Sequence, residues 1–169
     1  RGCSGRPNRI GRSYHSGDTR DIAHCINLIQ SQCPNNKLAA VGFSLGGNVL
    51  TRYLAKYPNN PLDASVVICA PLHLSSCSDK INRKFSKVYQ RYLVDMLKEA
   101  TAEKIDLNLI DHIGKKTLDK ITTIRQFDHL VTAPINGFDS AEHYYQQASG
   151  KYVLAKIERP LLIIHAKDD

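Results

Sequence analysis

The sequence contains no apolar run long enough to cross a lipid bilayer. Its longest apolar stretch, residues 64–72, is interrupted by Pro71, whereas a membrane-spanning helix needs about 18–20 apolar residues. Glycine (10 residues) and proline (7 residues) are too few for a collagen-like or linker-dominated chain. With 42% hydrophobic and 23% charged residues, the composition is that of a globular protein and excludes wholesale disorder.

Cysteine pairs and metal-binding clusters are also missing. The five cysteines include no Cys-x-x-Cys pair, so neither a zinc ribbon nor a thioredoxin-like redox pair is indicated. Cys25 and Cys69 lie in apolar surroundings and are expected to be small buried residues. The histidines show no His-x-x-x-His spacing, and no metal site is predicted. This cysteine usage favours a reduced, cytoplasmic compartment.

The chain is basic, with 23 Lys and Arg against 16 Asp and Glu and a net charge of +7. Eleven of the cations fall in residues 80–125, where six acids are interleaved with them. This mixture indicates solvated helix faces, and no nucleic-acid motif accompanies the charge. We therefore expect no nucleic-acid partner; a basic binder of nucleic acid or anionic surfaces is the less favoured hypothesis, and would require a steep loss of binding with salt.

Both ends of the sequence suggest a piece of a longer protein. It begins with Arg1 and shows no signal peptide, and it closes on an apolar stretch, 161–164, that leads directly to two acids. A length of 169 residues is short for the large α/β folds, which often use about 200–250. We expect the N- and C-terminal parts of the fold to lie outside this sequence, where a targeting or anchor segment could also lie.

The order of expected elements indicates an α/β fold. Short apolar runs at 38–43, 64–70 and 161–164 predict buried strands, and a helix is expected from Ser44 to about residue 57. Strand, helix and strand with buried strands are typical of a parallel sheet flanked by helices. Residues 18–34 predict a helix before the first strand.

The middle of the chain is expected to be helical. Apolar residues spaced by three and four predict a long amphipathic helix; they are Phe85, Val88, Tyr89, Tyr92, Leu93, Met96 and Leu97. Further helices are expected over 118–124 and 139–149. The predicted organisation is a core at 1–72, a helical cap insertion at 73–150 and a return to the core at 151–169.

The clearest chemical motif is Gly42-Phe43-Ser44-Leu45-Gly46. It matches Gly-x-Ser-x-Gly, with the expected strand before it and the expected helix after it, as a nucleophile elbow requires. Glycines at 42 and 46 would relieve crowding around a strained serine. The turn would present the Ser44 hydroxyl and aim the Leu45 N–H at a developing oxyanion.

A serine nucleophile needs a base and an orienting acid, in the chain order serine, acid, histidine. The acid is expected after a later strand, and the run at 161–164 leads to Asp168 and Asp169. We favour Asp169, with Asp168 as second choice. All seven histidines precede the acid, and His165 is expected to be structural because neighbouring strand-end residues point to opposite faces. The triad histidine is expected outside this chain.

Several blocks together resemble the YheT-type α/β-hydrolases. They are the residues 1–5, 14–17, 41–48, 85–92 and 165–169. The resemblance implies a mostly parallel eight-stranded sheet with a helical cap and a Ser-Asp-His triad that acts on carboxylic esters. It implies Ser44 as nucleophile, Leu45 as one oxyanion donor and Asp169 as triad acid, with the second oxyanion donor upstream of this sequence.

The expected function is a serine-dependent carboxylic ester hydrolase that acts on a small-molecule acyl ester and needs no cofactor. An alcohol acyltransferase with the same acyl-enzyme is the nearest alternative. A non-catalytic α/β-hydrolase scaffold is another, because fold does not fix function. The sequence alone does not specify the oligomeric state.

Overall fold

The computed structural model describes residues 8–167, which form two compact units. One contains residues 16–74 and 147–167, and the other contains 8–15 and 75–146. Asp168, Asp169 and residues 1–5, which carry sequence-based predictions, lie outside the described residues.

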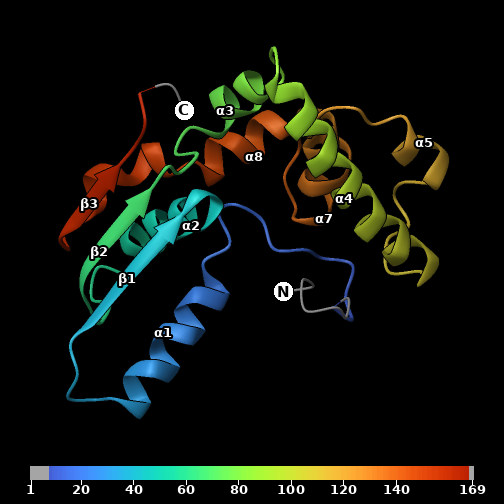
Figure 1. Ribbon diagram of the computed structural model, residues 1–169. Coiled ribbons are helices and arrows are strands. Elements are labelled where there is room, and N and C mark those ends of the chain that lie inside the picture. The colour runs from blue at the N-terminus through green and yellow to red at the C-terminus, as the bar shows by residue number, and fades with distance from the viewer. Residues whose placement is uncertain (1–7, 168–169) are drawn as a thin grey trace. The chain divides into compact units, whose positions relative to one another are not determined.

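The first unit is built on a parallel sheet in the order β1-β2-β3, with β1 at Leu38–Phe43, β2 at Leu62–Ile68 and β3 at Leu161–Ile164 (Figure 1). Helix α1 (Arg20–Gln32) precedes the sheet, and α2 (Ser44–Lys56) connects β1 to β2. This parallel sheet with flanking helices confirms the predicted fold class. A 3₁₀ segment, η2 (Gly150–Lys156), leads into β3.

The core of this unit lies where α1 and α2 meet one face of the sheet. Ile26, Leu50, Leu54 and Val67 are at most 7% exposed, and burial of each such side chain contributes about 1.5–3 kcal/mol. Cys69 is half-buried, and Cys25 is exposed, so the expectation that Cys25 is buried was wrong. The reason is helical spacing: α1 turns Ile26 to the core and its neighbour to solvent.

The opposite face of the sheet is apolar and exposed. Val41 and Phe43 of β1 are 56% and 63% exposed, and Leu162 and Ile164 of β3 are 57% and 48% exposed. The pairing register aligns these residues in two rows across the sheet. In residues 8–167 the expectation of buried strands therefore holds for the face of the sheet that packs against α1 and α2.

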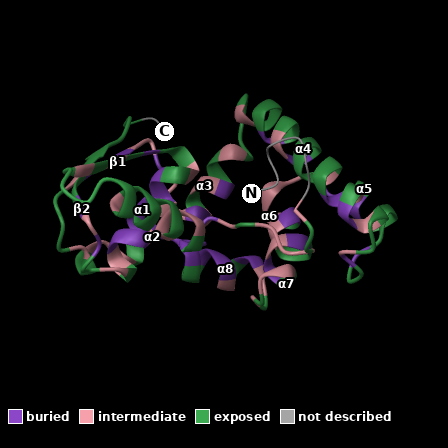
Figure 2. Cartoon of the chain, turned by 90° about the horizontal axis from the view of Figure 1, so that it is seen from below, coloured by how far each residue is buried: buried purple, intermediate pink, exposed green. Residues whose placement is uncertain are grey.

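The second unit is helical, with α3 (Leu74–Ile81) leading into the long α4 (Ser86–Asp106). Helix α5 (Lys115–Asp119) follows. A continuous helical stretch then comprises α6 (Ile124–Phe127), the π-helix η1 (Asp128–Thr132) and α7 (Ala133–Ile135), and α8 (Ala141–Ala148) comes last. Its core residues are Val94, Ile110, Ile113, Leu118, Ile121, Phe127 and Val131. Figure 2 marks buried residues along α8.

The single helix expected over 118–124 is two short helices. Helix α5 ends at Asp119, and Thr123 adopts an extended backbone whose side chain accepts a hydrogen bond from the Gln126 N–H. Threonine side chains compete with the helix backbone in this way and favour caps over helix interiors. The apolar spacing therefore predicted the buried residues Leu118 and Ile121 correctly, but it did not predict the break in the helix between Asp119 and Ile124.

A polar network joins three helices of this unit. Arg125 on α6 donates to Asp79 of α3 at 2.9 Å and to Glu142 of α8 at 2.8 Å, and its guanidinium lies 5.2 Å from the ring centre of Tyr145. Burial alone would lower the pKa of Arg125, but the hydrogen bonds to the two carboxylates raise it.

Within residues 8–167, no helix is both long and apolar enough to cross a membrane.

Candidate active site at the turn after β1

Ser44 occupies a strained turn between strand and helix. It follows the extended Phe43 directly, opens α2 and has φ +47°. A non-glycine residue in this left-handed region costs about 1 kcal/mol or more, and such strain concentrates at functional sites. The side chain is exposed. Ser44 is therefore held at the carboxyl end of β1 in the conformation that a nucleophile elbow requires.

Two glycines make the turn sterically possible. A Cβ at Gly42 would lie 2.7 Å from the Gly47 Cα, and a Cβ at Gly47 would lie 2.8 Å from the Ala70 Cβ. At Gly46 a Cβ would meet nothing within 4 Å among residues 8–167. Within the described residues, the close approach is therefore at Gly42 and not at Gly46. The second close approach is at Gly47, where the helix passes over the end of β2.

The amino end of α2 lies beside Ser44. The Leu45 N–H is among the first four N–H groups of this helix, which have no acceptor within it. Together with the aligned peptide dipoles, these groups give the helix start a partial positive charge that stabilises an anion. The turn therefore places the Ser44 hydroxyl next to groups that can stabilise negative charge.

Asn48, one turn into α2, is fully buried and holds three chain segments together. Its Nδ2 donates to the Ser16 carbonyl at 2.8 Å and to the Ala148 carbonyl at 2.9 Å, and its Oδ1 accepts from the Gly150 N–H at 2.8 Å. In the sequence, Asn48 stands out only as the last residue of the family block 41–48. A polar residue on an otherwise small and apolar helix face was the signal that could have revealed its role.

The strands end level with one another at this edge of the sheet. Phe43 is in register with Ile68, and Ile68 with Ile164, so the segment after β3 begins at the edge where Ser44 lies, two strands away. Adjacent strands are about 4.8 Å apart. His165, the first residue of that segment, is exposed. The favoured acid, Asp169, and the second choice, Asp168, come after the described residues.

Four other histidines have partners of their own. His73 Nε2 lies 2.9 Å from the Tyr152 hydroxyl, and His112 Nε2 lies 3.2 Å from the Leu130 carbonyl. His143 Nδ1 pairs with the Asp139 carboxylate at 2.9 Å. His129 Nδ1 accepts from the Ala141 N–H at 3.5 Å. Each of these four imidazole rings therefore has a structural contact nearby.

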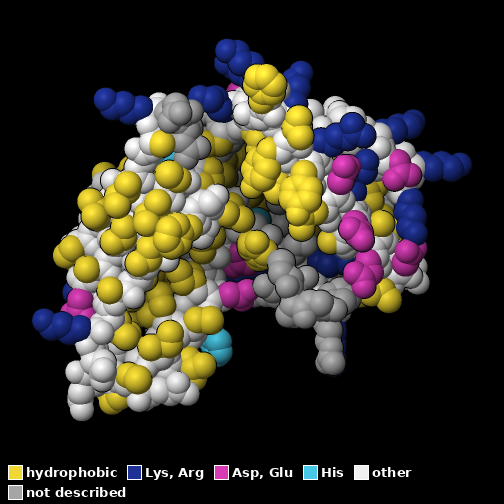
Figure 3. Space-filling view, viewed as in Figure 1, with side chains coloured by type: hydrophobic (Ala, Val, Ile, Leu, Met, Phe, Trp, Pro, Cys, Tyr) yellow, Lys and Arg dark blue, Asp and Glu magenta, His cyan; other side chains and the backbone are white. Residues whose placement is uncertain are grey.

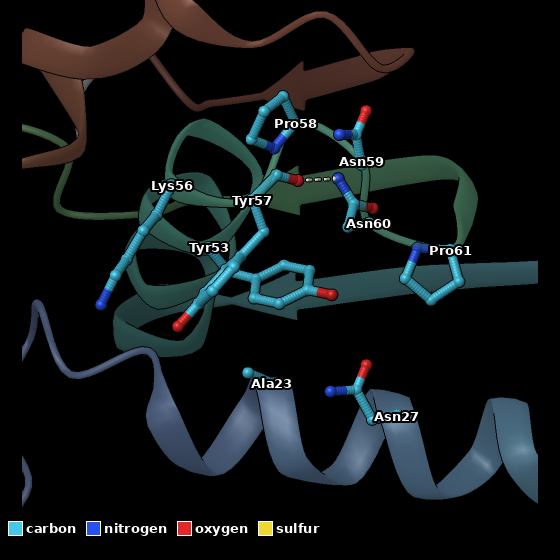
Figure 4. Close-up of a pocket in the computed structure, with 9 residues that line it drawn as sticks. All are labelled: Ala23, Asn27, Tyr53, Lys56, Tyr57, Pro58, Asn59, Asn60 and Pro61. Atoms are coloured by element: carbon cyan, nitrogen blue, oxygen red, sulfur yellow. Dashed lines mark hydrogen bonds between the residues drawn. The ribbon is translucent and has the colours of Figure 1, made fainter.

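A surface pocket lies at the opposite end of α2 from Ser44 (Figure 4). It is lined by Ala23, Asn27, Tyr53, Lys56, Tyr57, Pro58, Asn59, Asn60 and Pro61. Asn60 Nδ2 donates to the Tyr57 carbonyl at 2.7 Å. Burial, followed by the proximity of Tyr57, raises the pKa of Tyr53, which keeps the phenol neutral. Since α2 has 13 residues, the pocket is separated from the elbow by roughly 18 Å of helix.

Comparison with known proteins identifies relatives of this chain. The chain is 45% identical to the putative esterase YheT of Escherichia coli over its whole length, which covers 50% of that protein. It is 31% identical to a monoacylglycerol lipase of Saccharomyces cerevisiae and 26% identical to mouse phospholipase ABHD3, again over its whole length, covering 39% and 41% of those proteins. The chain thus spans half or less of these relatives, and no solved structure matches it significantly.

The family model that matches the chain describes the alpha/beta hydrolase fold and covers residues 1–169. This match confirms the resemblance found in the sequence motifs. The chain belongs to the alpha/beta hydrolase fold family.

Proposed function

We propose that the full-length protein is a serine hydrolase that cleaves carboxylic esters, with Ser44 as its nucleophile. The observation that carries the proposal is the left-handed backbone of Ser44 at the turn between β1 and α2. The names of the relatives, an esterase, a monoacylglycerol lipase and a phospholipase, support an ester substrate. The substrate class is a small-molecule acyl ester.

In the first half-reaction the Ser44 Oγ attacks the acyl carbonyl while a base removes its proton. The carbonyl oxygen becomes an oxyanion beside the Leu45 N–H and the amino end of α2, which stabilise the charge. The tetrahedral intermediate collapses, the ester C–O bond breaks, and the protonated base returns its proton to the departing alcohol. The product is an acyl-enzyme on Ser44.

In the second half-reaction the base removes a proton from water, and the resulting hydroxide attacks the acyl-enzyme. The carboxylic acid product is released, and the protonated base returns its proton to the Ser44 Oγ. Asp169 is the orienting acid in this proposal, with Asp168 second, and the base is a histidine outside this sequence. The level strand ends support this assignment, because the segment that carries both acids starts at the edge of the sheet that carries Ser44.

Labelling of the full-length protein with a fluorophosphonate probe tests the proposal. Ser44→Ala should abolish labelling and lower kcat/KM on a p-nitrophenyl ester by at least about a thousandfold. Ser31→Ala, which removes an exposed hydroxyl on α1, should leave both unchanged. Labelling that persists in Ser44→Ala would assign the nucleophile elsewhere. A wild-type protein that neither labels nor hydrolyses esters would be a non-catalytic member of the fold.

Substitution of the two acids separates their roles. Asp169→Asn should lower kcat by several orders of magnitude with little change in KM, because it disturbs the orientation of the base. Asp168→Asn should have a smaller effect. The reverse order would assign the triad acid to Asp168.

A further inference from the structure

Helix α4 presents its apolar side chains to solvent. Phe85, at the start of the helix, is 93% exposed, and Val88, Tyr89, Tyr92 and Met96 are between 52% and 75% exposed. Their spacing of three and four residues places them on one face. We call this set the α4 stripe. Single exposed apolar residues are ordinary, but a contiguous group of this kind marks an interaction surface.

The opposite face of α4 is fixed by buried polar contacts. Gln90 is 3% exposed, accepts from the Ile124 N–H at 3.2 Å and donates to Asn82 at 3.1 Å. Lys104 is 7% exposed and donates to the Gly11 carbonyl and the Ser13 hydroxyl at 3.1 and 3.0 Å. Rotating the helix to bury the stripe would break these bonds and leave buried polar groups unpaired, at about 1–3 kcal/mol each.

The residues around the first four side chains of the stripe, Phe85 to Tyr92, carry charge of one sign. Five cations occur between Asp79 and Asp95, and no acid does; the cations are Lys80, Arg83, Lys84, Lys87 and Arg91, all exposed. Asp79 is engaged by Arg125, and Asp95 lies 4.0 Å from Arg91 at the end of this segment. In Figure 3 hydrophobic side chains cover the upper part of α4, with Lys and Arg side chains around its upper end. The charges are therefore mixed over 80–125 as a whole but wholly basic between Asp79 and Asp95, the segment that carries all of the stripe except Met96.

We propose that the α4 stripe and its surrounding cations bind the surface of a lipid bilayer that contains anionic phospholipids. An interfacial helix of this kind inserts apolar and aromatic side chains at the level of the headgroups and sets Lys and Arg against lipid phosphates. Tyrosine suits that position because its ring is apolar and its hydroxyl is polar. Lysine and arginine extend their charged groups past the apolar zone into the headgroups.

Charge argues against a second copy of the chain as the occupant. A symmetric dimer through this face would bring the same five cations from each copy together, and like charges at an interface are repulsive. Nucleic acid would satisfy the cations but would leave the apolar centre of the stripe unmatched. A bilayer satisfies both the apolar and the charged parts.

The experiment is flotation of the full-length protein with two kinds of vesicle, phosphatidylcholine alone and phosphatidylcholine with phosphatidylglycerol in equal amounts. We expect binding to the mixed vesicles that weakens with added salt, and much weaker binding to phosphatidylcholine alone. The Ser44→Ala protein should bind as the wild type does. Membrane binding and ester hydrolysis can therefore succeed or fail independently.

Two sets of variants, each with a matched control, assign the binding to this surface. Lys84→Gln with Lys87→Gln should weaken binding about fivefold for each charge removed, whereas Lys116→Gln with Lys120→Gln, exposed cations on and just after α5, should have little effect. Phe85→Ser with Val88→Ser should weaken binding at least about tenfold. Leu107→Ser, at a 52% exposed leucine after α4, is the apolar control. All variants should keep the wild-type melting temperature, because surface changes rarely alter stability by more than about 0.5 kcal/mol.

Three results would overturn the proposal. The first is that the wild-type protein does not float with mixed vesicles. If Phe85→Ser with Val88→Ser also lowers the melting temperature, another part of the full-length protein covers the stripe. A wild-type dimer that these substitutions convert to a monomer would assign the face to a second copy. If the Lys84–Lys87 and Lys116–Lys120 variants lose the same amount of vesicle binding, the binding is general charge attraction and does not involve the α4 stripe.

Discussion

The buried side chain of Asn48 accepts a hydrogen bond from the backbone N–H of Gly150 at 2.8 Å, across 102 positions of sequence. The approach is so close that a Cβ at Gly150 would lie 2.9 Å from the Asn48 Oδ1. The same asparagine also donates to the carbonyls of Ser16 and Ala148. The Asn48 side chain, in the helix that starts at Ser44, thus fixes the chain at Ser16 and at Ala148–Gly150 against that helix.

Asn48→Ala should lower the free energy of unfolding of the full-length protein by about 2–4 kcal/mol, because three buried backbone groups lose their partner. Urea unfolding measures the change. Asn59→Ala, at an exposed asparagine, should stay within about 0.5 kcal/mol of wild type. Gly150→Ala should also destabilise, and its effect should be non-additive with that of Asn48→Ala. Simple additivity would mean that the two residues act separately.

Gly47→Ala should destabilise the protein by about 1–3 kcal/mol, since its Cβ would lie 2.8 Å from the Ala70 Cβ and 3.0 Å from Val67. Gly46→Ala is the matched change one residue earlier. There a Cβ meets open space, and alanine is the better helix former by up to about 1 kcal/mol. In thermal unfolding, Gly46→Ala should therefore have a higher melting temperature than Gly47→Ala. Equal destabilisation would contradict the assignment of the close approach to Gly47.

Asp128 should make stability depend on pH. Burial raises the pKa of its carboxyl from 3.8 to about 6, although hydrogen bonds from Tyr145 and Thr132 and the charge of Arg125 oppose the rise. Between these two pH values the folded state holds a proton that the unfolded state has released. The free energy of unfolding therefore falls as pH rises through this interval, by about 2–3 kcal/mol in total.

Asp128→Asn should remove this contribution, because an amide does not titrate there. Urea unfolding across pH 4–7 should show that the stability of the variant relative to wild type increases with pH. Asp119→Asn, at an exposed aspartate, should follow the wild-type profile. A stability difference between Asp128→Asn and wild type that does not change with pH would contradict a raised pKa.

Arg125→Lys should destabilise the helical unit even though the charge is kept. The guanidinium reaches Asp79, Glu142 and the Ser75 hydroxyl at 2.8–2.9 Å and lies over the Tyr145 ring. A lysine ammonium is a single point charge and cannot hold all of these at once. We expect a loss of about 1–2 kcal/mol in urea unfolding. Arg91→Lys, at an 87% exposed arginine, should be neutral, and an equal loss there would contradict the role of the guanidinium geometry.

The elements near Ser44 could be read from the sequence because they depend on local patterns. The apolar run at 38–43 and the small and apolar residues after Ser44 match β1 and α2. The run at 161–164 matches β3. Each signal lies within a dozen residues, where steric and hydrophobic preferences act directly. Cys25 and the break at Thr123 were mispredicted, because the direction of one side chain or a single capping bond decided them.

The sequence by itself determined the parallel α/β character, the Gly-x-Ser-x-Gly turn and the mixed charge of residues 80–125, because these are properties of neighbouring residues. Only the tertiary structure decided which glycine is crowded, what Asn48 holds and which face of α4 meets solvent. These features depend on contacts between segments up to 102 positions apart. No local pattern encodes the backbone approach of Gly47 to Ala70, or the buried contacts of Gln90 and Lys104 that turn an apolar stripe outward.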